Sequence, residues 1–195
     1  MRRRTTAQTP AEPRRWPQKT LFTIGHSTLP IERFIRVLAA YGIEQLVDIR
    51  TVPRSRHNPQ FNSDALDASV HAAGIEYRAM PALGGLRHTH AGSANTGWRN
   101  KSFRGYADYM QTEAFREAVE TLIDMSRRKP TAIMCAEAVP WRCHRSLVAD
   151  AVTIRGVPVA EILSETSFRM HKLTPFAHVD GTAITYPEAH AARVS

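Results

Sequence analysis

Short apolar runs alternate with amphipathic helical segments over most of this chain, from residue 20 to about residue 163. The first apolar run, residues 21–25, is followed by apolar residues at helical spacing that stop at Gly42. The same rhythm recurs down the chain. Such alternation is typical of a parallel sheet covered by helices on both faces. The sequence therefore predicts a single Rossmann-like α/β domain whose mostly parallel sheet has about five strands flanked by helices.

The expected elements follow from this pattern and from its Gly and Pro stops. Residues 81–101 hold four glycines and are expected to form a long loop, and Asp180-Gly181 marks a tight turn. The helix expected over 102–129 breaks near Gln111. The other expected helices are 30–41, 63–74 and 143–155, and the expected strands are 21–25, 45–50, 75–79, 131–135 and 157–163.

The composition is that of an ordinary soluble domain. A chain of 195 residues with 43% hydrophobic content can bury one core. No apolar run reaches the roughly 20 residues that span a bilayer, and no apolar segment follows the basic N-terminus, so we expect a cytoplasmic protein without a membrane partner. The two cysteines are expected to be reduced thiols.

The formal net charge of +8 is concentrated at the N-terminus. Residues 1–19 hold six basic residues against Glu12 alone, and three prolines, and are predicted to be a flexible basic arm ahead of a domain over residues 20–195. The arm is interpreted either as a solubilising tail or as a nonspecific nucleic-acid-binding segment.

Polar side chains follow the ends of three expected strands. His26 comes after the first, Asp48 and Arg50 end the second, and Glu137 comes just after the fourth. Because the carboxyl ends of parallel strands share one edge, these groups are expected to converge in a crevice where ligands bind.

The segment from Cys135 to Ser146 carries thiols, a carboxylate, an imidazole and guanidiniums. Cys143 stands at the expected N-terminus of a helix, where the dipole lowers a thiol pKa, so it is a candidate nucleophile; the alternative is a small packed residue beside a capping His144. Cys135, inside a strand, is interpreted as a core residue.

Arginines along the same edge predict an anion site, because guanidiniums bind phosphate or carboxylate in a bidentate manner. Asp48 and Glu137 either orient those arginines or act as general acid or base, and His26 and His144 are further acid–base candidates. The candidate anion-binding residues are Arg50, Arg54, Arg142 and Arg145, and the candidate catalytic residues are His26, Asp48, Glu137, Cys143 and His144.

No cofactor is indicated. Neither a G-x-G-x-x-G fingerprint after the first strand nor a P-loop motif occurs, and no paired C-x-x-C or H-x-x-x-H step announces a structural metal site. An open catalytic metal site assembled from several strands would leave no such local spacing, so the cofactor is unknown and no metal ligand is assigned.

Several motifs in combination resemble one known family. They are Thr23-Ile24-Gly25-His26-Ser27-Thr28, Asp48-x-Arg50 with Pro53, Ser55 and Pro59-Gln60-Phe61, Leu83-Gly84-Gly85, and Cys135-x-Glu137 with Pro140 and Cys143-His144-Arg145. Together they resemble the domain of unknown function 488 family over about residues 20–163. The resemblance implies a compact α/β fold with a shared polar pocket, and it brings no settled activity.

Three functions are open from the sequence. The favoured one is an enzyme whose Arg-rich anion pocket holds a phosphate-bearing small molecule, a nucleotide or a nucleic-acid end. The second is a non-catalytic nucleic-acid-binding accessory protein, based on the basic arm and the Arg-rich loops. The third is a thiol- or metal-dependent redox enzyme.

Overall fold

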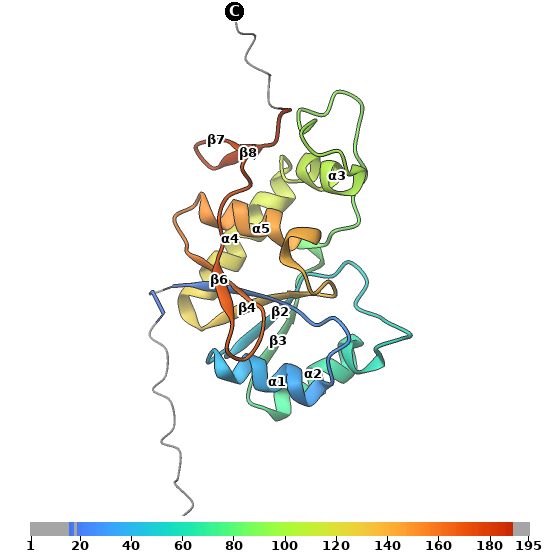
Figure 1. Ribbon diagram of the computed structural model, residues 1–195, viewed down its shortest axis with the longest axis vertical. Coiled ribbons are helices and arrows are strands. Elements are labelled where there is room, and N and C mark those ends of the chain that lie inside the picture. The colour runs from blue at the N-terminus through green and yellow to red at the C-terminus, as the bar shows by residue number, and fades with distance from the viewer. Residues whose placement is uncertain (1–15, 18, 189–195) are drawn as a thin grey trace, which may run out of the picture.

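The fold is known from a computed structural model, which describes residues 16–17 and 19–188 (Figure 1). Its centre is a six-stranded sheet of order β3-β2-β4-β1-β5-β6. The first five strands are parallel, and β6 adds antiparallel to β5. This confirms a single α/β domain with a mostly parallel sheet. The strands are β1 Leu21–Gly25, β2 Gln45–Asp48, β3 Glu76–Ala79, β4 Thr131–Cys135, β5 Val159–Ile162 and β6 Phe168–Met170.

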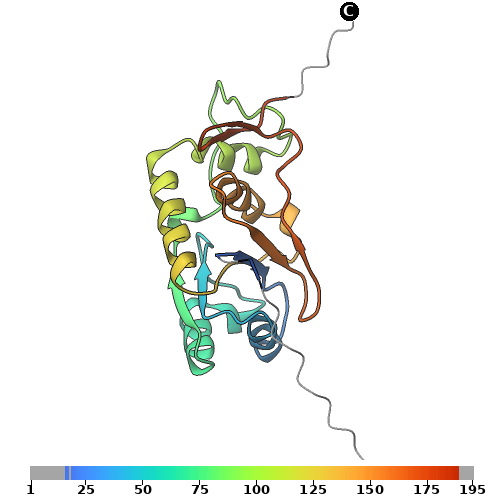
Figure 2. The same cartoon turned by 90° about the vertical axis from the view of Figure 1, so that its left-hand side faces the viewer.

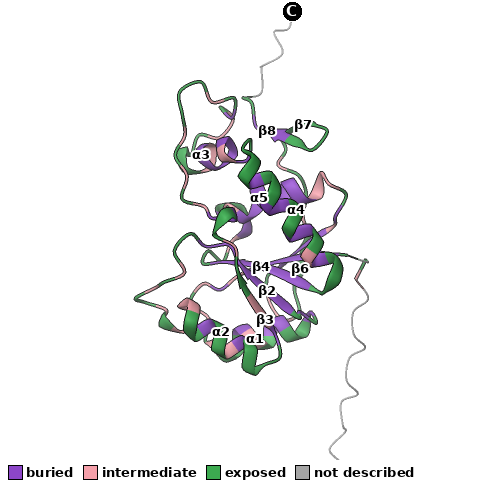
Figure 3. Cartoon of the chain, turned by 180° about the vertical axis from the view of Figure 1, so that it is seen from behind, coloured by how far each residue is buried: buried purple, intermediate pink, exposed green. Residues whose placement is uncertain are grey.

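Helices cover both faces of the sheet, as Figures 1 and 2 show. One face packs on α1 (Ile31–Ala40) and α2 (Ser63–Ala72). The other packs on α3 (Lys101–Tyr109), α4 (Glu113–Arg128) and α5 (Arg145–Thr153). Strand β4 lies between β1 and β2 and is buried throughout (Figure 3). Three single-turn 3-10 helices lie in the connections, η1 (Pro59–Phe61), η2 (Pro81–Leu83) and η3 (Pro140–Arg142).

The elements differ from the sequence prediction mainly at their ends. Helix α5 begins at Arg145 instead of residue 143, because the preceding turn is η3 and Cys143 has an extended backbone with φ −128° and ψ 146°. The break near Gln111 is confirmed by the gap between α3 and α4. Strand β6 was not predicted, because three exposed residues give no usable periodicity.

The N-terminal boundary of the packed domain includes Trp16. Its ring lies edge-on against Phe22, with centroids 4.9 Å apart, and against Phe168 at 4.7 Å. Residues 1–15 of the expected basic arm lie outside the described residues, so the prediction of a flexible arm stays a prediction.

The C-terminal segment is tied to α5 through a buried carboxylate. Asp150 on α5 is fully buried and accepts hydrogen bonds from the hydroxyls of Thr174 and Tyr186, at 2.7 and 2.9 Å. His171 bridges Asp150 and Glu161, both at 2.8 Å. The segment then forms the hairpin of β7 (His178–Asp180) and β8 (Ala183–Thr185), whose turn uses a positive φ at Gly181, as the sequence predicted.

The position of β4 creates a crevice at the carboxyl edge of the sheet. The helices that follow β1 and β2 cover one face, whereas the helix that follows β4 covers the other. Neighbouring strands whose connections leave on opposite faces open a gap between them. Within the described residues, no helix combines the length and apolar character needed to cross a membrane.

Candidate thiol site

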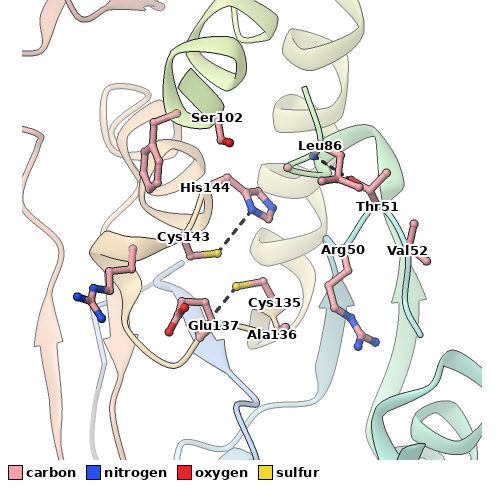
Figure 4. A pocket seen from close by; sticks show the side chains of 13 residues that line it. Arg50, Thr51, Val52, Leu86, Ser102, Cys135, Ala136, Glu137, Cys143 and His144 are labelled. Atoms are coloured by element: carbon pink, nitrogen blue, oxygen red, sulfur yellow. Dashed lines mark hydrogen bonds between the residues drawn. The ribbon is translucent and has the colours of Figure 1, made fainter. Parts of the chain in front are cut away.

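A cavity of about 360 Å³ opens beside the carboxyl end of β4 (Figure 4). A second hollow of about 460 Å³ adjoins it and shares four of its lining residues, Arg50, Val52, Ala136 and Glu137. The first cavity is also lined by Thr51, Gly85, Leu86, Ser102, Phe103, Cys135, Arg142, Cys143 and His144. Both thiols therefore lie at the sheet edge where distant segments of the chain converge.

The two cysteines meet at the floor of the cavity, where their sulfur atoms point toward each other (Figure 4). Both are free thiols. The Cys135 thiol donates to the backbone carbonyl of Glu137 at 3.9 Å, and the sulfur of Cys143 lies 3.5 Å from Nδ1 of His144. The neighbouring Cys143 thiol, helped by the positive charge of Arg145, lowers the pKa of Cys135 to about 7 although burial opposes ionisation. The neighbouring Cys135 thiol and burial raise the pKa of Cys143. The pair therefore loses one proton easily and holds the second tightly.

The sequence made Cys143 a candidate nucleophile or a small packed residue, and interpreted Cys135 as a core residue. Cys135 is part of the buried core, with 1% of its surface exposed, and it also lines the cavity. Cys143 receives a helix N-terminal donor, since the backbone N–H of Arg145 points to its sulfur at 3.5 Å. Its role as a nucleophile stays a prediction.

The imidazole of His144 lies next to the thiol of Cys143. Its Nε2 lies 3.2 Å from the carbonyl oxygen of Ile49, which can only accept a hydrogen bond, so Nε2 carries the proton. The Nδ1 lone pair then faces the sulfur of Cys143 at 3.5 Å. Burial lowers the pKa of His144 to about 4, which keeps the ring neutral and this lone pair available as a base.

Arg145 supplies a buried positive charge next to the thiols. Its side chain is 1% exposed, and it forms no ion pair with a carboxylate in the described part of the chain. Nη2 donates to the carbonyl of Ala138 at 3.4 Å, whereas Nε and Nη1 are buried without a hydrogen-bond partner. A buried cation favours the ionised form of an acid beside it, and the charge of Arg145 acts in this direction on the pKa of both thiols.

Two glycines allow the chain to pack this closely around the site. A Cβ atom at Gly25 would lie 1.9 Å from the carbonyl oxygen of Glu137 and 2.8 Å from Nη1 of Arg145. A Cβ atom at Gly85 would lie 2.4 Å from Nδ1 of His144. Both glycines are therefore needed for close approach to the loop that carries the thiol site.

Asp48 and Arg50 form a buried ion pair at the end of β2. The Nη2 atom of Arg50 lies 2.6 Å from Oδ2 of Asp48 and donates to the carbonyl of Phe61 at 2.8 Å. The hydroxyl of Tyr77 donates to the same carboxylate at 2.9 Å. The pairing role that the sequence left open for Asp48 is the one seen here, and it leaves Arg50 little capacity for an external anion.

His26 is held by its neighbours on both ring nitrogens. Nε2 faces Nη1 of Arg50 at 3.3 Å, and since guanidinium only donates, Nε2 accepts and Nδ1 donates to the carbonyl of Ser27 at 2.8 Å. The ring stacks on Phe61 at 4.1 Å, and burial lowers its pKa to about 4. Its lone pair is thus already engaged.

The site lies largely within a stretch of the chain that matches a known family. The profile described as domain of unknown function DUF488 matches residues 30–152, which is more than half of the chain. The chain belongs to the DUF488 family. Comparisons with curated proteins and with solved structures found no match.

The remaining predicted residues of this DUF488 domain lie at the rim. Arg142 lines the cavity and Arg54 lines the adjoining hollow, and both are exposed and without an ion pair in the described residues. Glu137 is exposed between the two hollows and accepts the backbone N–H of Val139 at 3.3 Å. It pairs with no arginine within the described chain, unlike Asp48.

The sequence did not reveal three parts of this DUF488 site. The fold brings the carbonyl of Ile49 and the hydroxyl of Tyr77 to the site from other parts of the chain. No local sequence pattern therefore indicates them. The third, the space kept by Gly85, was present in the Leu83-Gly84-Gly85 motif but had no assigned reason. Within residues 16–17 and 19–188, no cluster of three or more His, Cys, Asp and Glu side chains could hold a metal ion.

Proposed function

We propose that this protein is an enzyme whose nucleophile is the thiolate of Cys135. The observation that carries the proposal is the gathering of two thiols and a neutral imidazole in one cavity, with Cys143 in contact with His144 and the buried side chain of Arg145 following in the chain. A thiolate is the reactive form of cysteine, and a nearby cation together with a hydrogen-bond donor favours it. Cys143 and His144 form the proton path behind it.

The substrate we propose is a small molecule with an apolar part and an anionic group. A cavity of about 360 Å³ falls within the size range of small-molecule sites. Val52, Leu86 and Phe103 supply apolar surface, and Arg142 supplies a free guanidinium at the same opening. A phosphate or a carboxylate would suit that guanidinium.

Alkylation with iodoacetamide tests the nucleophile. We expect the rate of Cys135 labelling, mapped by peptide mass spectrometry, to rise through about pH 7 and to be lost in Cys135→Ser. In Cys143→Ser, labelling of Cys135 should persist but need a higher pH, because the thiol that most lowers the pKa of Cys135 has been removed. Labelling of Cys135 only near the pH of an ordinary thiol would refute the proposal.

A second alkylation tests the anion site. Iodoacetate carries a carboxylate and iodoacetamide does not, so the ratio of their rates measures local charge at the same sulfur. We expect this ratio to fall about threefold or more in Arg142→Gln and to stay unchanged in Arg116→Gln, an exposed control on α4. Equal ratios in the wild type and Arg142→Gln would remove Arg142 from the site.

The described residues do not favour nucleic acid as the partner. That function depends on the basic arm, of which residues 1–15 lie outside the described residues. The observations at the sheet edge favour a compact substrate instead.

A further inference from the structure

We propose that Cys135 and Cys143 catalyse thiol–disulfide exchange with low-molecular-weight thiols and disulfides, Cys135 as the attacking and Cys143 as the resolving cysteine. The inference rests on the proposed function and goes one step further, because it assigns the second thiol a covalent role and names the substrate class. Its basis is that both residues line the same cavity and that their sulfur atoms point toward each other there (Figure 4).

The local chain favours a bond between the two sulfurs. Cys135 ends β4 and Cys143 precedes α5, and between them lie the exposed residues 136–138 and the single turn η3. A disulfide needs Cβ atoms roughly 4 Å apart, and the sulfur atoms already point toward each other, so closure asks for a local shift of this loop alone. The short loop can make that shift without moving the sheet or the helix.

The exchange can be written with its atoms and electrons in balance. The Cys135 thiolate attacks one sulfur of a disulfide RS–SR′, forms a Cys135–SR bond, and releases R′S⁻, which takes a proton from water. Cys143 then gives its proton to Nδ1 of His144 and attacks the sulfur of Cys135. The Cys135–Cys143 bond forms, the bond to SR breaks, and RS⁻ takes the proton from His144. Two electrons pass from the two thiols to the substrate disulfide, and small thiols reverse the sequence.

His144 is placed for the resolving step. A neutral thiol is a poor nucleophile, so Cys143 needs a base before it can attack. Nδ1 of His144 faces its sulfur at 3.5 Å, and the carbonyl of Ile49 fixes the tautomer that leaves Nδ1 free to accept the proton. The imidazole therefore serves the thiol that cannot ionise by itself.

Arg145 sets the direction in which the exchange runs more easily. The reduced pair can carry a negative charge beside the guanidinium, whereas a disulfide is neutral and leaves that buried cation without compensation. The reduced form is therefore favoured, and the disulfide form is a good oxidant of small thiols. Both sulfurs are nearly buried, so the reacting partner has to enter the cavity, which excludes a folded protein surface.

Oxidised glutathione is the probe for the test, with the full chain, acid quenching and peptide mass spectrometry. We expect the wild type to form the Cys135–Cys143 disulfide, Cys143→Ser to accumulate a glutathione adduct on Cys135, and Cys135→Ser to form no internal disulfide and little adduct. Circular dichroism of each serine variant controls for folding. The wild type should also accelerate exchange between oxidised glutathione and a second small thiol.

Other outcomes overturn specific parts of the proposal. A wild type that keeps its glutathione adduct on Cys135 and forms no internal disulfide would refute the resolving role and leave the nucleophile intact. Iodoacetamide labelling of Cys135 without any reaction with oxidised glutathione would refute the exchange activity alone. An adduct found on Cys143 in Cys135→Ser, at the wild-type rate, would reverse the two roles.

The variant His144→Asn separates the two chemical steps. Loss of the base should slow the conversion of the mixed disulfide to the internal disulfide by about a hundredfold, while the first attack by Cys135 keeps its rate. Transient glutathione adduct on Cys135 should then become visible in the time course. Equal rates of resolution in the variant and the wild type would remove His144 from the exchange.

Discussion

The imidazole of His144 and the backbone of Gly85 occupy adjoining space, since a Cβ atom at residue 85 would lie 2.4 Å from Nδ1 of His144. Two segments about sixty residues apart in the chain are thus matched in shape at the atom that we propose to act as a base. The backbone of Gly85 does not have a positive φ, so its conformation does not require a glycine. The requirement comes from the imidazole of His144, which leaves no space for a side chain.

Gly85→Ala should displace the His144 ring and weaken its bond to the Ile49 carbonyl. We expect a loss of about 1 to 3 kcal/mol in the free energy of unfolding, the usual cost of overpacking, measured by urea denaturation. The ring nitrogen signals of His144 in NMR should shift as well. A variant with wild-type stability and unchanged signals would show that the ring has room to move.

Replacing Arg145 tests the electrostatic support of the thiolate. In Arg145→Leu the pKa of Cys135, followed by the ultraviolet absorbance of the thiolate, should rise from about 7 toward its ordinary value of 9. Arg145→Lys keeps the charge and should keep most of the shift. If both variants titrate like the wild type, the interaction with Cys143 alone accounts for the low pKa of Cys135.

Asp48→Asn should be strongly destabilising, because it leaves Arg50 as a buried cation without its partner. We expect a loss of about 3 to 5 kcal/mol in the free energy of unfolding. Tyr77→Phe is the matched control, because it removes one hydrogen bond to the same carboxylate and should cost about 1 kcal/mol. Similar losses in the two variants would contradict the importance of the ion pair.

The His171 contacts predict a decrease in stability at alkaline pH. Although burial opposes it, the hydrogen bonds that His171 donates to Asp150 and Glu161 raise its pKa from 6.5 to about 9. Because the folded pKa lies above the unfolded one, the stabilisation is fully present below pH 6.5 and is lost as the pH rises through 9. The loss should be on the order of 2 kcal/mol.

Urea denaturation on both sides of that pH range measures this effect. His171→Asn should be less stable than the wild type at neutral pH and should show a flatter pH dependence. His178→Asn, at an exposed position on β7, is the control and should follow the wild type. A steep decrease that persists in His171→Asn would assign the effect to other groups.

The sequence was sufficient for the order of elements and for the edge at which the polar groups meet. Hydrophobic alternation fixed β1 to β5 and the break between α3 and α4, since those signals are local. It could not decide which thiol carries the charge, because that depends on the contact between Cys135 and Cys143 and on the guanidinium of Arg145.

The same limit applies to the arginines. Four were expected to bind an anion, yet Arg50 is occupied by Asp48 and Arg145 is buried beneath the loop after β4. Sequence spacing placed all of them at the correct edge but carried no information on their partners. Arg54 and Arg142 are the two that remain exposed at the rim.

The carboxylate of Asp150 has a consequence for how this family can vary. Asp150 lies within the stretch that the DUF488 profile matches, whereas its donors His171, Thr174 and Tyr186 lie beyond residue 152. A relative that lacked the later segment would leave the same charge enclosed without donors. We therefore expect an acidic residue at this position and the C-terminal extension to be inherited together, or to be lost together.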